Sequence, residues 1–256
     1  MMYTDFEQVY LDVLGSGDEK CKQALTAHKW LHYRMLDLRH NGTLQGELYG
    51  PVGMYCGVHD RAQQVMIEDV IGTSTLLGFV VDNDADAFFL KHQFREVTRL
   101  NIDIYTIKNA SDEYTYACSA ADLRELDLNG YLMEQLQCPP LVRTLFCSFH
   151  ALHNVLWRSG VDNFTHAEQH RLAELGGGSF SVYIYQHPHM THYKGSISEF
   201  SGELSTISSV LRTEGGGACT RLMDSLIMNR SKNSPLIFSD ADITRTNALI
   251  NCILSP

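Results

Sequence analysis

The sequence contains no apolar run that approaches the roughly 18 residues needed to cross a membrane. Its first residues, Met1 to Asp5, lack the basic and then apolar pattern of a signal peptide, so we expect an intracellular protein. Its seven cysteines are odd in number and widely scattered, which favours reduced thiols over a disulfide framework. A formal net charge of −10 excludes a surface that binds nucleic acid all over, but it allows a local basic patch.

The common catalytic signatures are missing as well. The chain has no phosphate-binding P-loop, no glycine-rich dinucleotide fingerprint after a strand, no His-Glu-x-x-His zinc motif and no Gly-x-Ser-x-Gly nucleophile motif. We therefore expect a protein with no catalytic activity of its own, no cofactor and no metal.

An acidic cluster, Asp82, Asp84 and Asp86, follows a short apolar run. A calcium loop would need glycine at its sixth position and glutamate at its twelfth, where this chain has Ala87 and Gln93. The aspartyl-phosphate motif of phosphohydrolases would need threonine or valine in place of Asp86. Capping and the helix dipole explain carboxylates at the start of a helix without any catalysis. The alternatives that stay open are a small metal-dependent phosphohydrolase that uses Asp82 and Asp84, and a solitary ligand-binding domain.

Two groups of histidines are weak candidates for a metal site. Cys147, His150 and His153 lie three residues apart in a predicted helix, so the outer two point to different faces and cannot share one tetrahedral zinc. The second group straddles a turn with no cysteine or acid beside it, and we interpret it as an exposed hairpin tip. Its members are His187, His189 and His192.

Hydrophobic periodicity predicts a mixed α/β fold made of two halves of similar size. Residues 18–38 have the spacing of a helix seam, which fits either the end of a coiled coil or a helix that packs on its own domain. In the first half we expect a bent strand at 47–58, a helix at 61–70, a strand at 76–81, a helix at 87–100 and a strand at 102–107. In the second half we expect a helix at 141–152 with Phe149 inward, a strand at 155–157, a capped helix at 165–175, and strands at 180–185 and 191–198.

Three consecutive glycines, Gly176, Gly177 and Gly178, precede the strand at 180–185. Glycine lets a second backbone come close and allows positive φ, at an entropic cost that needs a reason. Two explanations stay open: a loop that leads into an ordinary hairpin, or an approach shaped to receive the backbone of a partner.

Short stretches distributed along residues 28–212 resemble, in their order and spacing, the hinge of SMC (structural maintenance of chromosomes) proteins. These stretches are Trp30-Leu31 before Arg39-His40, Glu47 to Val52, Gly78 to Val81 with Asp86 and Phe89-Leu90, Leu100 to Asp103, Leu123 to Leu126, Gly130 to Leu132, and Pro139 to Val142. The resemblance is closest to the fifth Smc paralogue, which pairs with the sixth in the DNA-repair complex.

The resemblance implies an α/β (α+β) fold like that of SMC hinges, with two α/β subdomains, mixed sheets and a short coiled-coil remnant. It divides the chain into a helical segment at 1–45, hinge subdomain I at 46–120, hinge subdomain II at 121–212 and a tail at 213–256. It also implies a nuclear, chromosome-associated role in DNA repair, in which the module joins two SMC subunits. The sequence has no ATPase head, and its tail shows no sustained heptads.

The resemblance places the glycine triplet beside the hinge–hinge interface, where a partner strand would extend the sheet. The expected partner is another SMC hinge, that of the sixth Smc paralogue. The interface residues that we predict are Gly176, Gly177, Gly178, Phe180, Val182, Tyr183 and Ile184.

SMC hinges often bind DNA, yet acidic residues outnumber basic ones across residues 28–212. Any contact with single-stranded DNA should therefore be local and weak. The best candidate surface is the basic side of the helix predicted at 87–100 together with the strand that follows it, although a solvated helix face is the simpler explanation of the same residues. The residues are Lys91, Arg95, Arg99 and Lys108.

Overall fold

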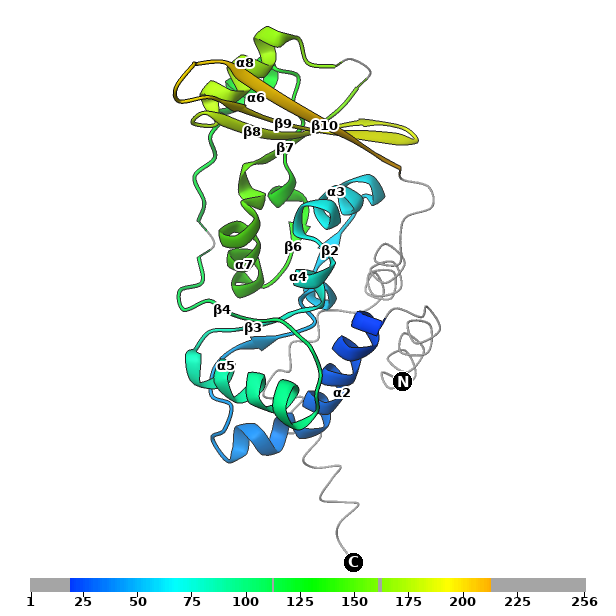
Figure 1. Ribbon diagram of the computed structural model, residues 1–256, viewed down its shortest axis with the longest axis vertical. Helices are drawn as coiled ribbons and strands as arrows, with labels where there is room; N and C mark the ends of the chain where they lie inside the picture. The colour runs from blue at the N-terminus through cyan, green and yellow to red at the C-terminus, as the bar shows by residue number, and fades with distance from the viewer. Residues whose placement is uncertain (1–18, 112, 161–162, 213–256) are drawn as a thin grey trace, which may run out of the picture.

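The computed structural model describes residues 19–111, 113–160 and 163–212, and it confirms a mixed α/β fold (Figure 1). Our expectations for residues 1–17 and for the tail at 213–256 lie outside the described residues. No helix in the described ranges is long and apolar enough to cross a lipid bilayer.

The first half of the chain is mainly helical, with short strands between the helices. Its elements are α2 (Glu19–His40), β1 (Leu48–Tyr49), the 3-10 helix η1 (Val52–Tyr55), β2 (Gly57–Val58), α3 (Arg61–Ile71), α4 (Thr73–Leu77), β3 (Phe79–Val81), α5 (Asp84–Lys91), the π-helix η2 (His92–Val97) and β4 (Ile104–Thr106).

The second half contains the longer strands. Its elements are α6 (Ala120–Glu125), β5 (Gly130–Tyr131), the 3-10 helix η3 (Leu132–Gln135), β6 (Leu136–Gln137), α7 (Pro140–His150), the 3-10 helix η4 (Leu152–Asn154), β7 (Val155–Ser159), α8 (His166–Leu175), β8 (Ser179–Gln186), β9 (His189–Ile197) and β10 (Leu204–Arg212).

The strands form three sheets. The largest has the order β10, β9, β8, β7, β5, and its β7 and β8 are the one parallel pair in it. A three-stranded sheet has the order β1, β3, β4, and β2 pairs with β6 across the two halves of the chain. In Figure 1 the five-stranded sheet lies between α8 and α6 on one side and α3 and α7 on the other, while β3, β4, α5 and α2 lie at the opposite end of the molecule.

Helix α2 packs on the rest of its own chain. Its seam residues Cys21, Ala24 and Leu31 are buried, and they contact apolar side chains of other elements. The helix ends before Gly42, whose φ of 74° favours glycine. Of the two explanations for the seam at 18–38, the structure therefore supports packing on the chain's own core.

The largest cluster of buried apolar side chains draws on both halves of the chain. It brings Val52, Met66 and Val80 together with Leu145 and Tyr183. A division of the chain near residue 120 would therefore place the two larger sheets in different halves, but it would cut through a core that both halves share. The subdomain boundaries stay a proposal.

Some of our local predictions are wrong. Residues 47–58 form β1, η1 and β2 in place of one bent strand, because Pro51 has no N–H to donate to a ladder. Leu76 and Leu77 belong to α4, so the strand begins only at Phe79. The helix predicted at 87–100 begins at Asp84 and becomes a π-helix from His92.

The helix predicted at 141–152 ends at His150, and Phe149 does not point inward. The side chain of Phe149 is 59% exposed and meets the edge of the Tyr105 ring. Leu145, one helical turn earlier, is fully buried and holds the expected inward position.

Candidate functional site

The glycine triplet ends helix α8 and turns the chain into strand β8. Gly177 and Gly178 have φ of 69° and 101°, and their N–H groups bond to carbonyl groups in the last turns of α8. A Cβ at Gly176 would collide with the carbonyl oxygen of Ser179. The backbone that approaches the triplet therefore belongs to this chain, and an internal turn explains all three glycines.

Strand β8 lies inside the sheet, so our prediction that a partner strand pairs with it is wrong. It is bonded to β7 on one side and to β9 on the other, which leaves no free edge. The four β8 side chains that we assigned to an interface are at most 7% exposed: Phe180, Val182, Tyr183 and Ile184. They form the core on both faces of the sheet and offer no surface to a partner.

The long free edge of this sheet is β10. Among the described residues no strand pairs with the outer side of β10, whereas its inner side pairs with β9 over nine residues. Ile207 and Val210 on this strand are 73% and 67% exposed. The opposite edge, β5, has only two residues, and both are buried.

The acidic cluster holds a neighbouring loop. The carboxylate of Asp86 is 1% exposed and accepts hydrogen bonds from the backbone N–H groups of Gln45 and Gly46, the latter at 2.8 Å. Asp82 accepts the N–H of Glu47 at 2.9 Å. Because backbone N–H groups occupy these oxygens, the structure gives no support to the phosphohydrolase that we kept as an alternative.

The helix cap in this region is Asn83, whose side chain accepts the N–H of Asp86. Asp84 is exposed and pairs with Lys108 at 2.6 Å. Surface ion pairs of this kind contribute little stability, but this one reduces the charge that Lys108 can offer to DNA.

The three other predicted DNA contacts do not share one helix face. Lys91 ends α5, Arg95 lies in the π-helical turn, and Arg99 lies beyond the helix with a φ of 56°. All three side chains are exposed. Their contact with DNA stays a prediction, but the structure does not place them on one helix face, as the four-residue spacing had suggested.

The histidine and cysteine groups do not form a metal centre. Among the described residues no three His, Cys, Asp or Glu side chains are close enough to hold an ion. His150 instead lies 3.0 Å from the Thr75 hydroxyl, and burial lowers its pKa. Burial raises the pKa of the Cys147 thiol.

Of the hairpin histidines, His187 and His189 are exposed at the tip, but His192 is buried. Its Nε2 is 2.8 Å from Ser181 Oγ and its Nδ1 is 3.3 Å from a carboxylate oxygen of Asp69. Tyr183 donates to the same Asp69 oxygen at 2.6 Å and stacks on the His192 ring. The hydrogen bonds to His192 and Tyr183 lower the pKa of Asp69 against the opposing effect of burial.

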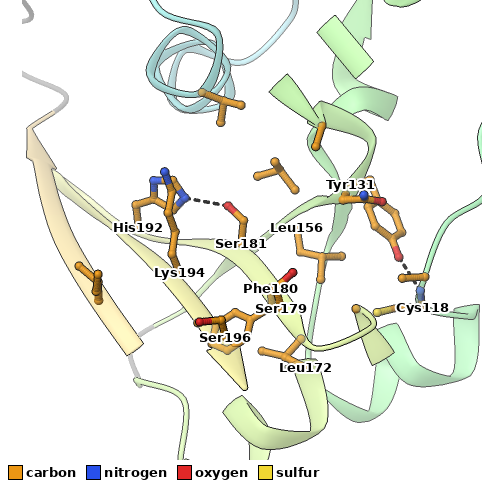
Figure 2. Close-up of a pocket in the computed structure, with 18 of the residues that line it drawn as sticks. Cys118, Tyr131, Leu156, Leu172, Ser179, Phe180, Ser181, His192, Lys194 and Ser196 are labelled. Atoms are coloured by element: carbon orange, nitrogen blue, oxygen red, sulfur yellow. Dashed lines mark hydrogen bonds between the residues drawn. The ribbon is translucent and has the colours of Figure 1, made fainter. Parts of the chain in front are cut away.

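The sequence did not reveal this network, because Asp69 is more than 100 residues away from Tyr183 and His192 along the chain. The alternation of β9 carried a usable signal, because His192 stands two residues after the buried Met190 and so shares its face. The network borders a cavity of about 590 Å³ between the sheet and the ends of α3 and α7 (Figure 2).

No protein-family model matches this chain, and no curated protein matches it. Among solved structures, the hinge domain of S. pombe Smc5/6 aligns with a TM-score of 0.66 and 16% identity, over 98% of this chain and 85% of that chain. An asymmetric dimer of the Geobacillus stearothermophilus SMC hinge domain aligns with a TM-score of 0.43 and 18% identity, over 98% of this chain and 95% of that chain. The first alignment confirms the architecture that the short sequence stretches implied: the chain has the fold of an SMC hinge domain.

Proposed function

We propose that this chain is a hinge-type dimerisation module of an SMC protein, with no catalytic activity of its own. The observation that carries the proposal is the open edge of β10 on an SMC hinge fold. A free edge presents a row of unpaired N–H and C=O groups, which is a template for a strand from a partner.

Strand addition at β10 is favoured by the strand's length and by its side chains. Nine residues are long enough to make a continuous ladder with a partner, in contrast to the two buried residues of β5 at the other edge. Ile207 and Val210 would lose their exposure on pairing, which adds hydrophobic stabilisation to the backbone hydrogen bonds. The described part of the edge carries no aspartate, glutamate, lysine or proline between 204 and 211 to discourage pairing.

The partner that we propose is another SMC hinge, and the hinge of the sixth Smc paralogue is the first to test. The likeness to the S. pombe Smc5/6 hinge domain and the order of the short sequence stretches both support this choice. On this proposal the protein acts at chromosomes in the nucleus, in chromosome organisation and DNA repair, with subdomain I at 46–120 and subdomain II at 121–212.

The test is light scattering coupled to size exclusion, with the chain alone and mixed with SMC hinges. The variant Ser208→Lys/Val210→Lys places two charges on the edge strand, where both side chains are exposed, so the monomer should remain folded. The matched control Phe88→Lys/Val97→Lys adds the same charge on exposed apolar positions of α5 and η2. We expect a dimer that the edge variant weakens at least tenfold and the control leaves intact. A chain that stays monomeric with every hinge, or a dimer that resists the edge variant, would refute the proposal.

A further inference from the structure

The cavity beside His192 is lined by one face of the five-stranded sheet. Register fixes which side chains share that face, because cross-strand partners in β8, β9 and β10 stand side by side and alternate residues point the same way. One end of the face is covered by the core through Tyr183, Tyr185 and Met190. Two further rows continue beyond the core: Ser181, Lys194 and Ile207, then Ser179, Ser196 and Ser205.

The open rows are rich in hydrogen-bond donors. Ser179 pairs with Ser196, and Ser196 pairs with Ser205, so three hydroxyl groups lie in line across three strands, each about 5 Å from the next at Cβ. Among the described residues these three hydroxyls make no hydrogen bond, and the positive charge of Lys194 acts on the Asp69 carboxylate, whose pKa it helps to lower. Lys194 stands in the next row, two residues before Ser196 on the same strand.

The charge of the lining favours an anion. The chain has a net charge of −10, yet no aspartate or glutamate lines the cavity, whereas Lys194 does. Asp69 binds the far side of the His192 ring and Tyr183 binds Asp69, so the histidine and Ser181 are held in fixed positions. Because these side chains are already ordered, this part of the cavity needs little reorganisation when a ligand binds.

We propose that this cavity binds a small molecule through a phosphate monoester group. The phosphate oxygens accept hydrogen bonds from the ammonium group of Lys194 and from the hydroxyl groups of the serine row. The bond to Lys194 is charge-assisted and therefore stronger than a bond between neutral groups. The rest of the ligand lies against the apolar part of the lining on the same face, which includes Val70, Val155 and Ile207. At about 590 Å³ the cavity is much larger than a phosphate ion and falls in the size range of sites for small organic ligands.

The test is calorimetry on the full chain with three probes: adenosine 5′-monophosphate, adenosine and inorganic phosphate. We expect the monophosphate to bind most tightly, inorganic phosphate to bind more weakly and adenosine not to bind. The exposed Lys194→Gln should weaken the monophosphate at least about tenfold, because it removes the one full positive charge in the lining. The control Lys29→Gln, which removes an exposed lysine on α2 away from the cavity, should bind as the wild type does.

A second variant, Ser196→Ala, removes the central hydroxyl of the serine row and should weaken the binding of the monophosphate severalfold. The affinity for inorganic phosphate should fall in both variants in the same order. The proposal fails if the monophosphate does not bind at millimolar concentration, if adenosine binds as tightly as the monophosphate does, or if Lys194→Gln binds with wild-type affinity. Because both substituted side chains are exposed, unfolding does not confound these outcomes.

Discussion

The two larger sheets differ in how much backbone they leave open. Strand β3 at the centre of the three-stranded sheet is fully buried, and the edges of that sheet are only two and three residues long. The five-stranded sheet ends in β10, which has nine residues and two exposed apolar side chains. We infer that the first sheet serves internal stability and that the second also serves assembly. Substitutions in the two regions should therefore affect stability and assembly differently.

The largest effect should come from Asp86 in the first region. Asp86→Ala removes a buried carboxylate and leaves the N–H groups of Gln45 and Gly46 without their acceptor, so we expect a loss of about 3 kcal/mol in the free energy of unfolding. The control Asp84→Ala removes an exposed carboxylate two residues before Asp86 and should cost at most about 0.5 kcal/mol. Urea unfolding measures both. Equal effects in the two variants would contradict the structural role of Asp86.

An effect of similar size should follow from Gly177→Val/Gly178→Val in the second region. Both positions have positive φ, which costs a valine about 1 to 2 kcal/mol each, although no atom stands in the way of a Cβ. The control Gly57→Ala meets only ordinary contacts and should be tolerated better. Thermal unfolding combined with light scattering is the measurement. A double variant that keeps its stability but no longer assembles would show that the glycine triplet contacts a partner and would contradict the internal turn.

The next effect concerns pH and Glu68, which lies on α3 between the two halves. Burial raises the pKa of Glu68 to about 7, despite the hydrogen bond from Gln64. The folded state therefore holds a proton that the unfolded state releases near pH 4.5, so stability falls as pH rises from about 4.5 through 7. Glu68→Gln should remove this pH dependence, which amounts to about 3 kcal/mol across the interval, whereas Glu96→Gln at an exposed site should leave it in place. An unchanged slope in Glu68→Gln would contradict the assignment.

The weakest expected effect is on DNA. With about three phosphate contacts, single-stranded DNA should bind with a log–log salt slope of about −2 and with micromolar or poorer affinity. Arg95→Glu/Arg99→Glu should abolish this binding, because both side chains are exposed and Lys108 is already paired with Asp84. Fluorescence anisotropy across a salt series measures it. Tight binding with a steep slope that survives the reversal would place the contact elsewhere.

The sequence alone predicted those elements whose signals are local. The capped helix from Thr165 with Glu168, the stop of α2 at Gly42 and the hairpin of β8 and β9 all formed as expected. Each depends on residues within a few positions of one another, where capping chemistry and alternation act directly.

The candidate site was harder to predict because strand order is a non-local property. Alternation in Phe180 to Tyr185 identified a strand, but it could not show that β7 pairs on one side and β9 on the other. The parallel pairing of β7 and β8 brings together segments separated by helix α8. The contact between Asp69 and His192 likewise joins two elements whose packing no local pattern records.

Hydrogen exchange of the backbone amides, followed as the protein is diluted and as a hinge partner is added, tests most directly whether assembly occurs at β10. We expect the amides between Leu204 and Leu211 that point away from β9 to exchange quickly in the monomer and to gain protection on assembly. The alternate amides of β10, which point toward β9, should be protected in both states. Amides of β8 should be protected in both states, because both sides of that strand are already paired. Protection that appears in β8 and not in β10 on assembly would contradict the account.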